Sequence, residues 1–155
     1  MERDIWETKV RSIKLTDNLK DCAQLLSELH NISSEASLKQ IKIFLSDNNH
    51  RIFGLYDPFN DYDWKLLSVI TFSLDKLNDI NIITVHDFIT QIDERSKGYG
   101  EHLLAYVEEE WAEKKHYSGV IIDTNNKNER LENFLVNRMN YGFYNDKYIK
   151  NINNA

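Results

Sequence analysis

The chain has 155 residues, of which 41% are hydrophobic and 28% charged, and its formal net charge is −6. This composition is typical of one globular domain over residues 1–155, and no apolar run approaches the ~18 residues that a membrane-spanning helix needs. The negative charge argues against a general nucleic-acid binder, because such proteins neutralise phosphates with cations. The N-terminus has mixed charge and no apolar secretory segment, so we expect a cytoplasmic protein with neither nucleic-acid nor membrane partners.

The first part of the chain is predicted to form a strand, two helices and three further strands. The expected elements are a strand over 10–14, a helix capped by Thr16 or Asp17, a helix capped by Ser33 or Ser34, and strands over 51–56, 66–74 and 82–92. Short connections between the last three strands, including a polar break over 75–81, favour an antiparallel meander. The acidic, aromatic-rich turn over 57–63 either lines an amine site or is simply solvated.

Cys22 is the single cysteine of the chain and lies on the apolar face of the first predicted helix. A lone cysteine excludes an intramolecular disulfide and gives no cysteine cluster for a metal. We therefore expect a buried, inert thiol and no metal site.

The second part of the chain is predicted to form a helix, a buried strand, a second helix and a terminal strand. The short apolar run 119–123 is typical of a fully buried strand. Because a helix separates it from the strand over 82–92, these two strands are expected to be parallel. An apolar stripe over 131–139 marks the last helix, and a strand over 143–150 and a frayed tail over 151–155 follow it.

The loop over 95–100, with the sequence Arg-Ser-Lys-Gly-Tyr-Gly, joins the 82–92 strand to a helix. Its two glycines allow a sharp turn and a close approach of the backbone to a ligand, and Arg95 and Lys97 add positive charge. Free N–H groups at the start of the helix favour an anion, so the loop predicts a phosphate site. Alternatively, the two cations are a solvated surface pair.

Two nucleotide-binding loops are excluded by the residues that follow Gly100. A Walker A loop needs a lysine and a hydroxyl residue there, whereas Glu101 and His102 are present. A Rossmann fingerprint needs a further glycine three residues on, whereas that position holds Leu103.

The arginine-x-x-glycine-x-glycine pattern of the loop, between a strand and a helix, resembles motif A of the GCN5-related N-acetyltransferase (GNAT) family. The order of predicted elements is similar to that family from about Val10 to Lys150. The resemblance implies an α/β (α+β) fold in which helices flank both faces of a mixed, mostly antiparallel central sheet. It also implies metal-free transfer of an acetyl group from acetyl-CoA to the primary amine of a small molecule or peptide. The terminal strand offers a sheet edge through which dimers of this fold often form, so a homodimer is a further expectation.

The resemblance implies two groups of coenzyme A contacts. Backbone N–H groups of the loop would cradle the pyrophosphate, and the pantetheine arm would pair with the preceding strand where it splays from the 120–123 strand. An amide N–H at that bend would polarise the thioester carbonyl. The expected residues are Arg95, Ser96, Lys97, Gly98, Tyr99 and Gly100 for the pyrophosphate, and Phe88, Ile89 and Thr90 for the pantetheine arm. Asn126 or Asn128 either binds coenzyme A or caps the last helix.

His86 and Asp87 lie where many members of the family carry a base or an anchor for the amine. An attacking amine has to be neutral, so a base is expected near the substrate nitrogen. Strand neighbours face opposite ways, so only one of the two residues points into the cleft unless a bulge intervenes. We slightly favour Asp87, although histidine titrates nearer neutral pH. In the alternative, Asp87 orders a loop and His86 lies at the surface.

The last helix departs from the family, which often protonates the leaving thiolate with a tyrosine. Depending on the alignment, the tyrosine position holds Leu135, Val136 (if Asn140 takes a left-handed glycine role) or Arg138. Tyr141 and Tyr144 are candidate replacements, or they pack at an edge with their hydroxyls in solvent. This departure motivates a second hypothesis, a non-catalytic GNAT-fold module that binds acyl-CoA and contacts a protein partner.

Overall fold

In the computed structural model, which describes residues 8–58, 64–95, 97–123 and 129–152, seven strands form one sheet. The strands are β1 (Lys9–Ser12), β2 (His50–Asp57), β3 (Lys65–Leu77), β4 (Ile80–Thr90), β5 (Gly119–Ile122), β6 (Gly142–Tyr144) and β7 (Lys147–Asn151). Their spatial order is β1-β2-β3-β4-β5-β7-β6, and every neighbouring pair is antiparallel except β4 and β5. The predicted meander, the parallel pair and the mostly antiparallel sheet are therefore confirmed.

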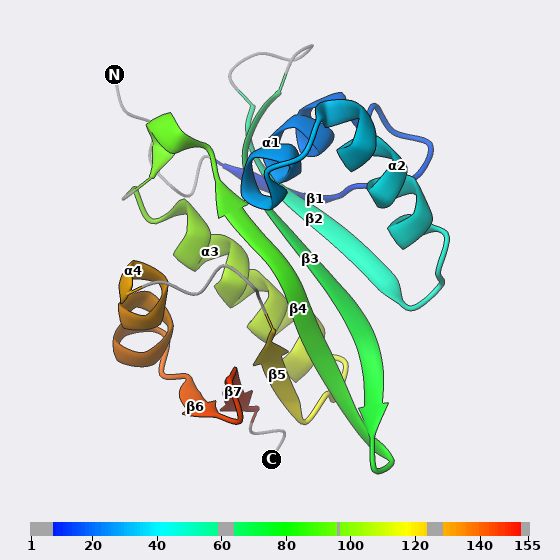
Figure 1. Ribbon diagram of the computed structural model, residues 1–155. Helices are drawn as coiled ribbons and strands as arrows, with labels where there is room; N and C mark the ends of the chain where they lie inside the picture. The colour runs from blue at the N-terminus through cyan, green and yellow to red at the C-terminus, as the bar shows by residue number, and fades with distance from the viewer. Residues whose placement is uncertain (1–7, 59–63, 96, 124–128, 153–155) are drawn as a thin grey trace.

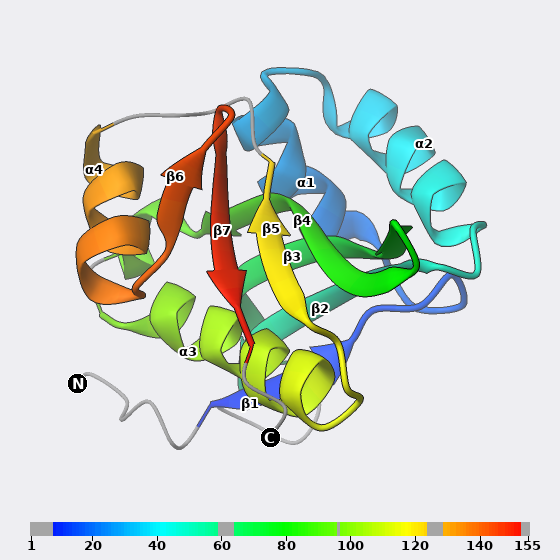
Figure 2. The ribbon, with the colours of Figure 1, turned by 90° about the horizontal axis from the view of Figure 1, so that it is seen from below.

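Helices cover both faces of the sheet (Figures 1 and 2). One face carries α1 (Lys20–His30) and α2 (Ser34–Leu45), and the other carries α3 (Tyr99–Tyr106) and α4 (Glu129–Glu132). Both helices of the second face continue as π-helical turns, α3 over Val107–Glu113 and α4 over Asn133–Arg138.

Each face of the sheet has its own hydrophobic core. Leu25 of α1 and Val69 of β3 are fully buried in one core, and Phe72 of β3 and Leu103 of α3 are fully buried in the other. Burying one such side chain contributes about 1.5–3 kcal/mol, so these layers hold the helices to the sheet. Cys22 lies in the first core at 2% exposure, as predicted, and burial is the main cause that raises the pKa of its thiol to about 12.

The two early helices start differently. Ser33 caps α2, because its Oγ accepts the N–H of Ala36 at 3.1 Å, which is one of the two caps expected. The expected cap of α1 at Thr16 or Asp17 is wrong, since that helix begins at Lys20 without a side-chain cap. Asp17 closes the preceding turn instead, where its Oδ2 accepts the N–H of Lys14 at 2.8 Å.

Two hairpins correct the predicted strand ends. The expected polar break over 75–81 is only a two-residue turn, Asn78 and Asp79, with φ of 52° and 66°. The expected single strand over 143–150 is the β6–β7 hairpin, with Asn145 and Asp146 at its turn. β7 continues to Asn151, which pairs with Gly119 of β5, so the expected tail begins later than 151. In each case strand pairing extends over polar residues that the sequence pattern had assigned to a loop or a tail.

Candidate functional site

β4 carries a β-bulge at His86 that separates it from β5. Asp87 pairs with Thr71 of β3 and Val85 pairs with Phe72, so His86 is the extra residue. The parallel pairing with β5 runs only as far as Val85, which lies opposite Ile122. Beyond the bulge, β4 and β5 diverge (Figure 1). The predicted splay therefore begins at the bulge.

Backbone groups of β4 face this gap. The N–H of Gln91 donates to the carbonyl oxygen of Leu67 in β3 at 2.8 Å, so the alternation of a strand turns the backbone groups of Phe88 and Thr90 away from β3. Arg95 Nε accordingly donates to the carbonyl oxygen of Thr90 at 3.1 Å. The gap thus presents the donor and acceptor groups that an added strand-like ligand would use.

A cavity of about 510 Å³ lies where β4, the end of β5, α3 and α4 meet. Seven residues of the predicted coenzyme A set line it: Phe88, Ile89, Thr90, Arg95, Gly98, Tyr99 and Gly100. Lys97 is not part of the lining, while Ser96, Asn126 and Asn128 lie outside the described residues. The cavity is also lined by residues that the sequence did not predict as coenzyme A contacts: Leu29, Glu94, Glu101, Ile122, Arg130, Leu131, Phe134 and Arg138.

The glycine loop brings the start of α3 against β4. Gly98 precedes the helix with a φ of 87°, which an L side chain adopts only under strain. A Cβ on Gly100 would lie 3.1 Å from the ring of Phe88, so a side chain there would press on this ring. The N–H of His102 makes an intrahelical bond to the carbonyl oxygen of Gly98, and the N–H groups of Tyr99 and Gly100 precede it. Because the first N–H groups of a helix lack helical partners, this cavity wall favours an anion.

Glu94 holds two lysines beside the loop. Its carboxylate accepts from Lys65 at 2.8 Å and from Lys97 at 2.9 Å. These two hydrogen bonds lower the pKa of Glu94, that from Lys65 most strongly. The charge of Lys97 is therefore shared with a carboxylate.

The last helix supplies an aromatic and cationic wall. The ring of Phe134 stacks on that of Phe88, with centroids 6.0 Å apart and planes at 17°. Arg138 Nε donates to Glu101 at 2.8 Å, which links α4 to the first turn of α3. Arg130, Phe134 and Arg138 are spaced by four residues, and residues at this spacing lie on one face of a helix. This spacing could have identified the wall from the sequence.

The helix end narrows the choice of the tyrosine position. Asn140 has a φ of 64°, the left-handed conformation that a glycine would take. Of the three alignments given above for the tyrosine that protonates the thiolate, this conformation supports the one in which Asn140 takes the glycine role. In that alignment the tyrosine position holds Val136. Neither this side chain nor that of Phe134, which does line the cavity, can donate a proton.

The two candidate tyrosines lie elsewhere. Tyr141 is 2% exposed, and its hydroxyl donates to Glu108 at 2.8 Å rather than facing solvent. Burial, and then the charge of Glu108, raises the pKa of Tyr141 well above 10. Tyr144 is 68% exposed on β6. Neither residue is part of the cavity lining.

The bulge turns both His86 and Asp87 toward the α1–α2 face. Asp87 accepts from Thr71 Oγ1 at 2.9 Å and contacts His30 Nε2 at 2.6 Å. His86 lies under α2, with its Nε2 2.8 Å from Ser73 Oγ and its ring edge-on to Phe44. The sequence could not identify His30, because it is 57 residues from Asp87 and ends a helix without a motif.

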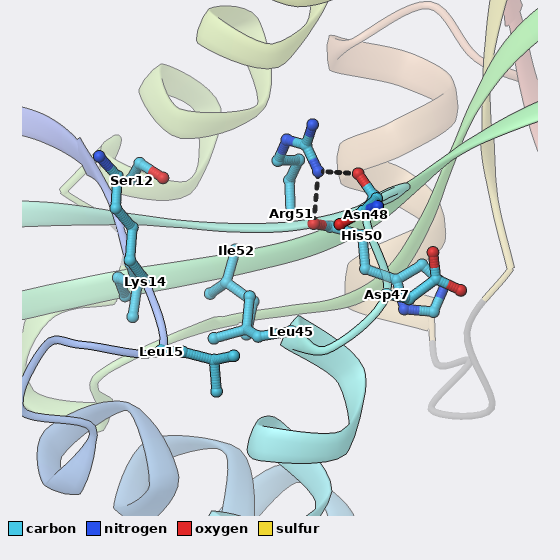
Figure 3. A pocket seen from close by; sticks show the side chains of 10 residues that line it. Ser12, Lys14, Leu15, Leu45, Asp47, Asn48, His50, Arg51 and Ile52 are labelled. Carbon is cyan, nitrogen blue, oxygen red and sulfur yellow. Dashed lines mark hydrogen bonds and ion pairs between the residues drawn. The ribbon is translucent and has the colours of Figure 1, made fainter.

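A second cavity, of about 420 Å³, lies between the end of β1, the end of α2 and the start of β2 (Figure 3). Arg51 is one of the residues that line it and donates to the carbonyl oxygens of Asn48 and His50. None of the predicted site residues lines this cavity.

Three expectations concern other kinds of site. The described residues contain no group of three or more histidine, cysteine or acidic side chains arranged to hold a metal. No helix in the described part of the chain is long and apolar enough to cross a membrane. Most of the acidic turn over 57–63 lies outside the described residues.

No protein-family model and no curated protein matches the sequence, but solved structures match the fold. The ribosomal-protein-alanine N-acetyltransferase of Brucella melitensis biovar Abortus 2308 is 15% identical, with a TM-score of 0.69 over 88% of this chain and 94% of that one. A GNAT family acetyltransferase of Staphylococcus aureus is 18% identical, with a TM-score of 0.64 over 79% and 88%. AAC(6')-Iy, in complex with the bisubstrate analogue CoA-S-monomethyl-acetylneamine, is 15% identical, with a TM-score of 0.65 over 87% and 90%. The chain therefore has the GNAT fold.

Proposed function

We propose that this protein transfers an acetyl group from acetyl-CoA to a primary amine. The observation that carries the proposal is one cavity, of about 510 Å³, that joins the open edge of β4 to the glycine start of α3. Coenzyme A needs both features, because its pyrophosphate is an anion and its pantetheine arm carries amides along an extended chain. The coenzyme A conjugate bound to AAC(6')-Iy, a protein of the same fold, supports this assignment.

On the donor side, the N–H groups at the start of α3 would bind the pyrophosphate, and Phe88 and Thr90 would offer backbone groups to the pantetheine amides. Arg95 donates to the carbonyl oxygen of Thr90, which keeps a second lone pair for a pantetheine amide. The other N–H groups of its guanidinium can pair with a phosphate. Acetyl-CoA itself supplies the activated thioester.

On the acceptor side, we place the chemistry at Asp87 rather than His86. Asp87 directly precedes Phe88 in the cavity wall, and its partner His30 directly follows Leu29, another lining residue. His86 is engaged with Ser73 beneath α2. A cationic acceptor suits the net charge of −6.

The competing function is a non-catalytic module that binds acyl-CoA. It is favoured by one observation, that α4 presents Phe134 and no hydroxyl to the cavity. Such a module would bind coenzyme A as an enzyme does but would release no thiol.

Calorimetry with coenzyme A and an assay of thiol release from acetyl-CoA separate these functions. The acceptor panel contains polyamines, aminoglycosides, amino acids and peptide N-termini. Acetyl transfer predicts binding and thiol release with at least one acceptor. Binding without release across the panel favours the module, and failure to bind coenzyme A contradicts both functions.

A further inference from the structure

His30, Asp87 and Thr71 form a connected set of side chains beside the cavity. The imidazole Nε2 of His30 is 2.6 Å from one carboxylate oxygen of Asp87, and Thr71 Oγ1 donates to the other oxygen at 2.9 Å. The three residues come from α1, β4 and β3, so the tertiary fold alone brings them together. Asp87 is therefore an acceptor at both of its oxygens.

This arrangement fixes the tautomer of the imidazole. A carboxylate accepts hydrogen bonds, so the proton of the neutral ring lies on Nε2 and the lone pair lies on Nδ1. Among the described residues, only Asp87 contacts the ring, through Nε2, so Nδ1 retains its capacity to accept a proton. The side chain of His30 is also 30% exposed, so a substrate can reach it.

The main chain holds His30 in place at the end of α1. Asn31 ends the helix with a φ of 55°, and its N–H donates to the carbonyl oxygen of Ser27. Leu29, one residue earlier, lines the cavity together with Phe88 and Ile89, which follow Asp87 in β4. His30 and Asp87 are therefore the chain neighbours of residues that line this wall of the cavity, although neither is part of the lining itself.

We infer that His30 is the catalytic base for the acceptor amine and that Asp87 is its positioning residue. This inference rests on the proposed acetyl transfer. His30 Nδ1 takes a proton from the ammonium group, and the resulting neutral amine forms a C–N bond to the acetyl carbon while the C–S bond breaks. The nitrogen loses two protons in all, of which one ends on the thiolate and the other in solvent. A protonated His30 can return its proton to the thiolate, which replaces the tyrosine that α4 lacks.

His30 is better placed than Asp87 to accept the proton of the amine directly. A carboxylate that already accepts from Thr71 and His30 has both oxygens engaged, whereas the imidazole has a lone pair to offer. Histidine is also the side chain whose ordinary titration range lies closest to neutral pH. The acceptor amine is thus expected to enter beside the C-terminal end of α1.

The first test compares His30→Gln and His30→Ala with the native protein, using acetyl-CoA and an acceptor that supports thiol release. Glutamine keeps an N–H donor for Asp87 but cannot take a proton, so a purely structural role would survive in His30→Gln. We expect kcat to fall by about 10²–10⁴-fold in both variants, with unchanged coenzyme A binding in both and an unchanged melting temperature in His30→Gln. Added imidazole should restore part of the activity of His30→Ala.

The controls separate this inference from the proposed function. His116→Asn changes an exposed histidine whose φ of 63° asparagine tolerates, and it should keep the native kcat. Native kcat in His30→Gln would overturn the inference and leave acetyl transfer standing. A native protein that releases no thiol with any acceptor would overturn both.

A second test adds a readout that needs no turnover, the tautomer of His30. Nitrogen NMR of the neutral imidazoles in the free protein should show His30 as the Nε2–H tautomer, with a signal that disappears in His30→Gln. In Asp87→Asn the tautomer or its hydrogen bond should change, and kcat should fall while KM for acetyl-CoA stays constant. An Nδ1–H tautomer in the native protein would overturn the positioning role of Asp87.

Discussion

Gly98 and Gly100 meet different steric constraints at the start of α3. Gly98 needs backbone freedom, because its φ of 87° lies in the left-handed region. Gly100 needs space, because a Cβ there would lie 3.1 Å from Phe88 and 3.5 Å from Thr90 Oγ1. Both Phe88 and Thr90 line the proposed coenzyme A cavity, so a side chain at Gly100 would disturb the ligand and the packing together.

Gly100→Ala is therefore expected to weaken coenzyme A binding by about tenfold, equivalent to about 1.4 kcal/mol. Overpacking against Phe88 should also lower the free energy of unfolding by about 1 kcal/mol. Calorimetry and urea denaturation measure the two effects. Gly142→Ala is the matched control, since its Cβ would meet only the carbonyl oxygen of Ile149, at 3.8 Å. Native coenzyme A affinity in Gly100→Ala would contradict the assigned cavity.

At the residue scale, local features could be predicted from the sequence and tertiary contacts could not. The glycine loop is readable because its residues are adjacent and the backbone itself forms the binding surface. The orientation of His86 and Asp87 depends on a β-bulge, which shifts the strand register by one residue. No residue in this part of the sequence indicates a bulge, so the orientation could not be predicted. The partner of Asp87 could not be predicted, because the contact with His30 depends on how α1 packs on the sheet.

At the scale of elements, the same dipeptide forms two hairpin turns. Asn78-Asp79 joins β3 to β4, and Asn145-Asp146 joins β6 to β7. All four residues have positive φ, as a two-residue turn of the I′ type requires. The sequence pattern made the first turn too long and missed the second, because neither contains the glycine that usually marks such a turn. It predicted the order of the remaining strands and helices, since their apolar periodicity and the long βαβ connection are visible in the chain.

Replacing the second residue of the β3–β4 turn by glycine should stabilise that hairpin. Asp79→Gly creates an Asn-Gly turn and removes a side chain from a left-handed position. The expected gain is about 0.5 kcal/mol, after the entropic cost of glycine in the unfolded chain. Urea denaturation measures it. Lys76→Gly, at an extended position of β3, should instead destabilise the protein. Destabilisation by Asp79→Gly would contradict this account of the turn.

At the scale of the whole molecule, a buried polar group ties the C-terminal part of the chain to α3. Glu108, in the π-helical continuation of α3, accepts from Tyr141 at 2.8 Å and from Lys150 of β7 at 2.7 Å. Glu108 is 8% exposed, so its charge is tolerable only with both partners in place. This contact joins segments that precede and follow β5 in the sequence and so helps to hold the β6–β7 hairpin in place.

Several buried and half-buried tyrosines make the stability of the whole molecule sensitive to alkaline pH. Burial is the main cause that raises the pKa of Tyr56 to about 12 and that of Tyr141 well above 10. Burial also raises the pKa values of Tyr106 and Tyr148. Near pH 10 and above, the unfolded chain releases these protons while the folded chain keeps them. The unfolded state therefore binds fewer protons, and the free energy of unfolding falls as pH rises.

For Tyr141 alone, the expected slope above pH 10 is about −1.4 kcal/mol per pH unit until its folded-state pKa is reached. Tyr141→Phe should cost about 1 kcal/mol at neutral pH through the lost bond to Glu108, yet its stability should fall less steeply in alkali. Urea denaturation from about pH 8 to pH 11 measures both effects. Tyr144→Phe removes an exposed hydroxyl and should follow the native curve. Equal alkaline slopes in the native protein and Tyr141→Phe would show that Tyr141 does not hold its proton more tightly when folded.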